Sequence, residues 1–368
     1  MSAKASLSDF DPRMAPLKGS DAVLLWHKPD SLPFRLAGFP WFDRDKVFRR
    51  LPRVPAEEFP AAVEWLANCT AGGQVAFQSD SRHVAVRVKL AGLANMNHMP
   101  ATGQCGFDLY IGSPSEMRFH NVTKYDHSLA EYEVLLFDHP DAVMRTFTLN
   151  FPLYQGVAEL QIGLDPDARI QAPVPYSVNG RIVCYGTSIT QGGCASRPGM
   201  AYTNILSRAL NAEVVNLGFS GSGKGEPEVC QAFAQMPDPR LFVLDYEANV
   251  DFERLQTTLP ENIRILRSQH PDVPILVVSR IPFAKDIGHA ENRRNYERAR
   301  EMQADLVEKA RAHGDPRIFF LDGSTLLGED FDECTVDGVH PTDMGFMRIA
   351  RGLEPVIRKI LDESQPEK

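Results

Sequence analysis

The hydrophobic pattern of the chain changes near residue 176, and this change constrains the fold more than any other feature of the sequence. Beyond residue 179, short apolar runs alternate with longer amphipathic stretches. The candidate strands cover 181–185, 212–216, 241–246, 275–279 and 318–321, and the candidate helices cover 202–210, 252–269, 292–313 and 345–361. This alternation predicts a parallel sheet with helices on both faces, which is an α/β domain. A ligand of such a domain is expected at the carboxyl ends of the strands.

The first half of the chain follows a two-residue period instead. Short runs in which apolar and polar residues alternate are separated by turn-forming residues, and they cover 83–90, 107–111, 132–137, 146–149 and 158–162. This pattern predicts an antiparallel β-sandwich, with a short helix expected at 55–68. Two prolines in the segment 171–176 indicate a stiff connection. We therefore expect a β-sandwich domain over residues 1–176 and the α/β domain over residues 177–368.

The charge and composition of the chain argue against several classes of protein. The net charge of −9 argues against binding to nucleic acid and to anionic lipid. No apolar run is long enough to span a bilayer, and residues 1–10 lack the apolar core of a secretory signal. The six cysteines form no CxxC pair, which is typical of buried thiols in a reducing compartment. We therefore expect a cytoplasmic protein without a membrane partner. The sequence leaves open whether the chain forms a homo-oligomer.

Ser188 is the first candidate for chemistry. The apolar run 181–185 ends at Gly186, where the chain can turn sharply, and Ser188 follows at the start of a predicted helix. Free N–H groups and the positive end of the helix dipole would favour a developing oxyanion there. The alternative is a serine that merely caps the helix, which is common in strand-to-helix loops.

Asp337 and His340 could complete a catalytic triad with that serine. They lie three residues apart on a turn-forming loop. A histidine can take the serine proton while a carboxylate fixes its tautomer through the other ring nitrogen. The alternative is that Asp337 belongs to an ordinary turn and His340 caps the helix that follows. Ser188, His340 and Asp337 together supply the equipment for acyl transfer through a covalent intermediate.

Two further loops at the same sheet edge could stabilise an oxyanion. Residues 218–224 match the G-x4-G-K phosphate loop, yet Gly225 follows where a serine or threonine would hold magnesium. We expect instead that Gly221 presents its backbone N–H to the substrate. Asn249, after the third strand, could donate its side-chain amide, although a local turn bond is the ordinary fate of such a residue. The histidines show no zinc-like spacing, so we expect no metal and no other cofactor.

These residues resemble the four sequence blocks of the SGNH hydrolases, also called GDSL esterases and lipases. The resemblance covers residues 179–368 and implies a three-layer α/β/α, flavodoxin-like domain. It implies that Ser188 is the nucleophile, that His340 is the base and that Asp337 orients it. It also implies an oxyanion hole formed by the N–H of Ser188, the N–H of Gly221 and the amide of Asn249.

Two departures from the family pattern and one further match accompany this resemblance. The first block reads Gly-Thr-Ser rather than Gly-Asp-Ser, and the third has Glu247 where many members have glycine, so we expect Glu247 to reshape the mouth of the site. Residues 106–110 resemble the G-x-D-L-Y motif of a β-sandwich, jelly-roll-like domain that precedes this hydrolase type. Asp108 of this motif could equally well satisfy a turn. Members with this layout look like carbohydrate deacetylases or acyl-group transferases.

The sequence therefore predicts a serine esterase that hydrolyses small acyl esters, with acetyl groups on a carbohydrate or another small hydroxylated compound as the expected substrate. An acyltransferase that uses the same serine is the first alternative. A nucleotide-binding protein that uses residues 218–224 and a non-catalytic carbohydrate-binding protein are alternatives from other classes.

Overall fold

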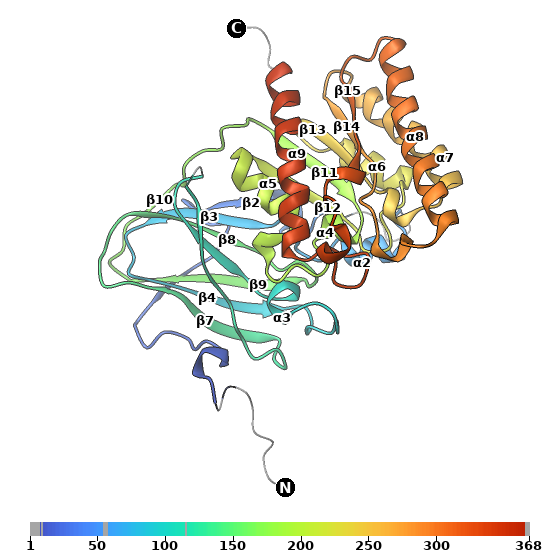
Figure 1. Cartoon of the computed structure of the whole chain (residues 1–368). Coiled ribbons are helices and arrows are strands. Elements are labelled where there is room, and N and C mark those ends of the chain that lie inside the picture. The colour runs from blue at the N-terminus through green and yellow to red at the C-terminus, as the bar shows by residue number, and fades with distance from the viewer. Residues whose placement is uncertain (1–7, 9, 54–57, 115, 365–368) are drawn as a thin grey trace.

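The computed structural model describes residues 8, 10–53, 58–114 and 116–364. Two antiparallel sheets make up the β-sandwich in the first half of the chain (Figure 1). One sheet has the strand order β1 (Leu25–His27), β9 (Val157–Leu164), β4 (His83–Leu90) and β7 (Glu131–Asp138). The other has the order β10 (Ile170–Gln171), β3 (Gln74–Ser79), β8 (Arg145–Asn150), β5 (Asp108–Ile111) and β6 (Arg118–Val122), with β2 (Arg35–Ala37) paired to β3.

The two-residue period of the sequence explains how these sheets pack. In β4, Val86 and Val88 are buried, while Arg87 and Lys89, the residues that follow each of them, are exposed. The buried residues of both sheets, among them Phe77, Phe107 and Phe147, form one apolar cluster between the sheets. Three short helices lie outside the sheets: α1 (Phe42–Asp45), α2 (Ala61–Leu66) and α3 (Ala101–Gln104).

The second half of the chain forms a five-stranded parallel sheet. Its strand order is β12 (Glu213–Gly218), β11 (Arg181–Gly186), β13 (Pro239–Asp245), β14 (Ile275–Val278) and β15 (Ile318–Leu321). The helices are α4 (Ser188–Gln191), α5 (Tyr202–Leu210), α6 (Pro227–Ala234), α7 (Phe252–Gln269), α8 (Ala290–Ala312) and α9 (Asp343–Glu363). When the strands are numbered by their order in the chain, their order across the sheet is 2-1-3-4-5. This is the flavodoxin-like order, with its topological switch between β11 and β13.

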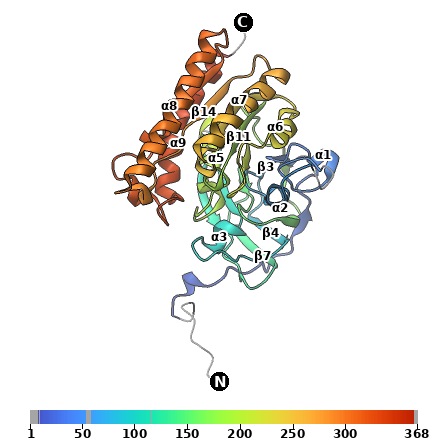
Figure 2. The same cartoon turned by 90° about the vertical axis from the view of Figure 1, so that its right-hand side faces the viewer.

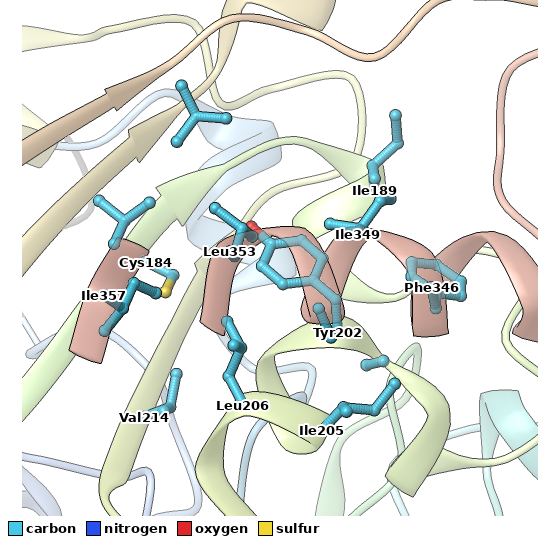
Figure 3. Close-up of a cluster of buried hydrophobic side chains, with 14 of the residues drawn as sticks. Cys184, Ile189, Tyr202, Ile205, Leu206, Val214, Phe346, Ile349, Leu353 and Ile357 are labelled. Carbon is cyan, nitrogen blue, oxygen red and sulfur yellow. The ribbon is translucent and has the colours of Figure 1, made fainter. Parts of the chain in front are cut away.

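Helices cover both faces of this sheet because neighbouring residues of a buried strand point to opposite faces. Ile182 and Cys184 of β11 lie in one apolar cluster with residues of α5 and α9. Val183 and Tyr185 lie in a second cluster with residues of α6, α7 and α8. Figure 1 shows α5 and α9 on one side of the sheet and α7 and α8 on the other, and Figure 3 shows the side chains of α5 and α9 packed together. The predicted fold class is confirmed.

Several predicted boundaries were wrong. The helix expected at 55–68 is shorter, because α2 covers Ala61–Leu66 and Pro60 precedes it, while residues 55–57 lie outside the described residues. The sequence analysis also missed α6, which begins at Pro227 after a glycine-rich loop. Proline is well tolerated in the first turn of a helix, because the N–H that it lacks would have no helical acceptor there.

The sandwich and the α/β region lie side by side (Figures 1 and 2) and share a buried contact at Arg50. Arg50 is completely buried, although a guanidinium is normally exposed. Its donors reach backbone carbonyl oxygens of both regions, those of Leu66 (2.7 Å), Cys69 (2.7 Å), Asn216 (3.1 Å) and Gly218 (2.6 Å). A buried charge is tolerated where hydrogen bonds satisfy its donors. Because Arg50 is bonded to both regions, it holds the end of β12 against the first half of the chain.

Leu51 and the segment 58–69 pack against the α/β region. Leu51, Val63 and Leu66 belong to the same apolar cluster as α6 and α7. We propose a domain boundary near residue 176, with α2 as the part of the first half that packs on the α/β core. No helix within the described residues has both the length and the apolar character that crossing a membrane requires.

Candidate active site

Ser188 is the first residue of α4, directly after β11 at the topological switch of the sheet. The helix cap is Thr187, whose hydroxyl oxygen accepts a hydrogen bond from the Ile189 N–H at 3.2 Å. Thr190 completes the capping box, because its hydroxyl oxygen accepts a hydrogen bond from the Thr187 N–H. The capping role that was the alternative for Ser188 therefore belongs to Thr187, and the Ser188 hydroxyl is left for another partner.

That partner is His340. The Nε2 atom of His340 lies 2.8 Å from Ser188 Oγ, and its Nδ1 atom lies 2.7 Å from Asp337 Oδ2. The loop between β15 and α9 thus brings its histidine to the end of β11, 152 residues away in sequence. The three residues expected to form a triad are joined by one chain of hydrogen bonds.

The other oxygen of Asp337 fixes the orientation of its carboxylate. Asp337 Oδ1 accepts hydrogen bonds from the backbone N–H groups of Val339 (3.1 Å) and His340 (2.8 Å). Partial burial alone would raise the pKa of Asp337, but the hydrogen bonds from the backbone and side chain of His340 outweigh it and lower the pKa below its ordinary value. Asp337 is therefore ionised near neutral pH and can stabilise a positively charged imidazole.

Two backbone N–H groups in the segments after β11 and β12 have no internal hydrogen-bond acceptor in the part of the chain that the structure describes. Neither the Ser188 N–H nor the Gly221 N–H has a hydrogen-bond acceptor among the described residues. Gly221 has a φ of +64°, a conformation that other residues rarely adopt, while a side chain there would meet nothing within 4 Å. Glycine is thus favoured at this position by backbone conformation and not by lack of space.

Asn249 lies beside the Gly221 loop. Its side-chain amide donates hydrogen bonds to the backbone oxygens of Phe219 and Gly223, both at 3.2 Å. These partners are 30 and 26 residues away, so Asn249 does not make the local turn bond that was its alternative. Asn249 fixes the loop that carries Gly221, and its amide lies at the same sheet edge as Ser188.

The β-sandwich supports the segment that carries the nucleophile. Tyr154 donates a hydrogen bond from its hydroxyl to the Ser188 carbonyl at 3.2 Å. Gln191 of α4 donates to the Leu153 carbonyl at 3.1 Å and accepts from the Ser220 N–H at 3.0 Å. The sequence analysis missed these residues, because nothing in the sequence indicates where the sandwich contacts the α/β region.

Glu247 has buried partners at the end of β13, and it also lines a polar cavity. Its carboxylate accepts hydrogen bonds from the Arg280 N–H (2.8 Å) and the Gln303 side chain (2.7 Å). Glu247 therefore ties the end of β13 to the end of β14 and to α8, and its effect on the mouth of the site stays a prediction.

Asp108 of the G-x-D-L-Y motif is also completely buried. It accepts hydrogen bonds from the Arg197 guanidinium (2.9 Å), the Asn150 side chain (2.7 Å) and the Gly199 N–H (2.8 Å). Arg197 and Gly199 lie in the segment between α4 and α5. The motif therefore joins the sandwich to the loop that follows the nucleophile, rather than closing a turn.

A polar cavity of about 400 Å³ lies near the carboxyl ends of β13 and β14. The polar side chains around it include Arg280, Lys285, Asn292, Asn295, Tyr296 and Arg298. It adjoins the loop of Asp337 and His340, since a side chain at Gly338 would lie 3.5 Å from the Lys285 backbone nitrogen.

Comparisons with known proteins find family matches for both halves of the chain. Residues 179–358 match the model of the GDSL-like lipase/acylhydrolase family, and residues 24–170 match the GxDLY model, which describes the N-terminus of SGNH-hydrolase-type esterases. No curated protein sequence matches the chain.

Solved structures of similar proteins cover nearly the whole chain. A structure from Bacteroides ovatus, described as that of a GDSL-like lipase, is 31% identical, with 92% of this chain and 98% of that chain covered and a TM-score of 0.84. The salicylyl-acyltransferase of a tetracycline biosynthetic pathway is 21% identical, with 92% and 97% covered and a TM-score of 0.72. A family two carbohydrate esterase from Cellvibrio japonicus is 15% identical, with 93% and 99% covered and a TM-score of 0.60.

Proposed function

Since the chain belongs to the GDSL-like lipase/acylhydrolase family and is an ester hydrolase, we propose that it releases short acyl groups from hydroxylated compounds through an acyl-enzyme on Ser188. The observation that carries the proposal is the hydrogen-bond chain from Ser188 Oγ through His340 to Asp337. This is the arrangement by which a serine hydroxyl becomes a nucleophile near neutral pH.

The proposed reaction has two halves. Ser188 Oγ attacks the ester carbonyl carbon while His340 Nε2 takes the hydroxyl proton, and the carbonyl oxygen becomes an oxyanion. The C–O bond to the alcohol then breaks, and the alcohol leaves with the proton from His340. Water, deprotonated by His340, attacks the acyl-enzyme, and the carboxylic acid leaves as Ser188 regains its proton. Asp337 stays ionised throughout and stabilises the imidazolium.

The N–H groups of Ser188 and Gly221, together with the Asn249 amide, are the proposed oxyanion donors. The support for the two backbone groups is that neither has an acceptor among the described residues. Asn249 would turn one amide hydrogen from a loop carbonyl to the oxyanion. The two backbone donors are held in place by the fold, so they need no reorganisation when the charge develops.

A short acyl group on a sugar is the substrate that the surroundings of Ser188 favour. A long acyl chain needs an apolar tunnel beside the nucleophile. Two cavities with mainly apolar linings, one of about 810 Å³ between α8, α9 and β15 and one of about 510 Å³ around Phe42, Phe48 and Leu160, are lined by residues other than Ser188 and His340. The cavity beside the Asp337 loop is polar and suits hydroxyl groups. The fold that the chain shares with a carbohydrate esterase supports the same choice.

Acyl transfer to an alcohol is the second candidate. It is favoured by the overall similarity of the fold to a salicylyl-acyltransferase. The same serine would serve, and the two activities differ in whether an alcohol or water attacks the acyl-enzyme.

The proposal is tested by measuring hydrolysis of p-nitrophenyl acetate, butyrate and octanoate, together with acetate release from acetylated xylo-oligosaccharides, by the wild-type protein and Ser188→Ala. We expect activity to fall with chain length, acetate to be released from the sugars, and both activities to be lost in the variant. Preference for octanoate would contradict the short-acyl proposal. If added alcohol acceptors gave new esters faster than acid was released, transfer would be the main activity.

A further inference from the structure

Four potential metal ligands from three separate segments meet beside the nucleophile. They are His98 in the loop before α3, Cys194 in the loop after α4, and Asp337 and His340 before α9. One ligand atom from each residue can be chosen so that all four lie within 4.8 Å of one another. In a tetrahedral zinc site with bonds of about 2.0–2.3 Å, ligand atoms lie about 3.3–3.8 Å apart. Small side-chain movements would therefore close the cluster around one ion.

The donor set selects the kind of ion. Two imidazole nitrogens, one sulfur and one carboxylate oxygen match the preferences of Zn²⁺ and Cd²⁺. Mg²⁺ and Ca²⁺ prefer oxygen ligands, of which the four side chains offer one carboxylate. A soft divalent cation is therefore the fitting ligand.

The positions of His98 and Cys194 support a site that a cation can reach. The side chains of His98 and Asp337 are 35% and 34% exposed, so the cluster opens to solvent on their side. His98 Nδ1 lies 3.1 Å from the side-chain oxygen of Asn97, while His98 Nε2 lies 3.9 Å from Asp337 Oδ2. Nε2 thus faces the cluster while the other nitrogen has a separate partner. Such a partner is how metal-binding histidines are usually oriented. Cys194 closes the buried side of the cluster.

We propose that His98, Cys194, Asp337 and His340 form an inhibitory binding site for a soft divalent cation such as Zn²⁺. On binding, the Cys194 thiol releases its proton to solvent and the thiolate coordinates the ion. A cation on either ring nitrogen of His340 prevents that residue from accepting the Ser188 proton. Because the ion also coordinates the Asp337 carboxylate, that carboxylate no longer orients the imidazole of His340. The inhibition rests on the proposed function, whereas the binding does not.

Zinc titrations of esterase activity test the inhibition. Wild-type, Cys194→Ser, His98→Asn and the control His127→Asn, which removes an exposed histidine of the sandwich, are assayed with p-nitrophenyl acetate. We expect Zn²⁺ to inhibit the wild-type and His127→Asn proteins equally and Mg²⁺ to leave them active. The Zn²⁺ concentration for half-inhibition should rise at least tenfold in the other two variants. Equal inhibition of all four proteins would overturn the proposal.

Cadmium binding to Ser188→Ala provides a readout that does not need activity. We expect the ultraviolet cadmium–thiolate band to appear with about one equivalent of Cd²⁺ and to disappear when Cys194→Ser is added to the same variant. A missing band, or a band unchanged by Cys194→Ser, would overturn the site. A band in Ser188→Ala, found together with no esterase activity in the wild-type protein, would keep the site and refute the proposed function. The melting temperature of each variant checks that it is folded, and His98→Asn tests the site independently of the cysteine.

Discussion

Asp337→Asn is predicted to abolish most of the activity while leaving the loop in place. The two oxygens of Asp337 have different partners in the structure. Oδ1 accepts two backbone N–H groups, from Val339 and His340, whereas Oδ2 faces His340 Nδ1. In the variant the amide oxygen must stay with the two N–H donors, because an NH₂ group cannot accept hydrogen bonds. The NH₂ group is therefore forced toward His340 Nδ1.

The consequence is the wrong tautomer of the base. With an NH₂ donor at Nδ1, that nitrogen must be the acceptor, and the ring proton moves to Nε2, which faces Ser188 Oγ at 2.8 Å. A protonated Nε2 cannot take the serine proton. The same substitution in a serine protease triad lowers turnover about 10⁴-fold, which corresponds to about 5.4 kcal/mol of transition-state stabilisation. We expect a loss of that order in kcat, with KM for p-nitrophenyl acetate changed by less than about threefold.

The matched control is Asp330→Asn. Asp330 lies on the same connection to α9, and its exposed carboxylate pairs with Arg348 and not with the imidazole. We expect this variant to keep wild-type turnover, because an exposed ion pair contributes little. Both variants are measured by steady-state hydrolysis and by thermal unfolding. An Asp337→Asn variant that is folded and within tenfold of wild-type kcat would refute the tautomer argument.

Three further predictions concern residues around the triad. Asn249→Ala should lower kcat about a hundredfold or more without unfolding the protein, and a kcat within threefold of wild type in steady-state assays would remove Asn249 from the oxyanion hole. Asp108→Ala leaves the half-buried Arg197 without its carboxylate partner. The free energy of unfolding in urea should therefore fall by about 3–5 kcal/mol. A loss below about 1 kcal/mol would contradict the role of Asp108 in joining the sandwich to the loop after the nucleophile. Burial raises the pKa of Asp245 from 3.8 to about 7 despite hydrogen bonds from Tyr202 and Thr190. Between these pH values the folded chain binds more protons than the unfolded one, so this group makes stability fall as pH rises. In urea titrations at several pH values, Asp245→Asn should weaken that fall, and an unchanged slope would show that Asp245 ionises normally.

The architecture could be predicted from the sequence because it depends on local patterns. The alternation of apolar strands with amphipathic helices after residue 179 was sufficient for the parallel sheet. The sequence analysis missed α6 because Pro227 and the glycine-rich loop before it are typical of a helix break when the tertiary contacts are unknown. Helix and strand ends depend on caps and tertiary contacts, which local patterns do not contain.

The sequence predicts those residues of the candidate site that belong to motifs with a characteristic spacing. It does not predict the residues that reach the site through tertiary packing. Ser188, Asp337 and His340 were expected together, and the structure places Ser188 and Asp337 each within hydrogen-bond distance of His340. The sequence analysis considered Ser188 as the helix cap and did not consider Thr187, although threonine is also a preferred cap residue. It gave no sign of His98, because that residue reaches the site through the docking of the sandwich on the α/β region.

The partners of Glu247 could not be predicted for the same reason. The Gln303 side chain of α8 and the Arg280 backbone N–H hold its buried carboxylate. Its burial depends on elements more than thirty residues away in sequence. No local pattern records such partners.

The central claim, that His340 activates Ser188 as the nucleophile, is tested most directly by covalent labelling. Diisopropyl fluorophosphate is incubated with the wild-type, Ser188→Ala and His340→Ala proteins, and the intact mass and the modified peptide are determined by mass spectrometry. Attack of Ser188 Oγ on phosphorus with loss of fluoride should give one adduct per chain, on the peptide that contains Ser188. We predict rapid labelling of the wild-type protein, none of Ser188→Ala, and labelling slowed at least a thousandfold in His340→Ala. An adduct on another residue, or equal labelling rates with and without His340, would contradict the account.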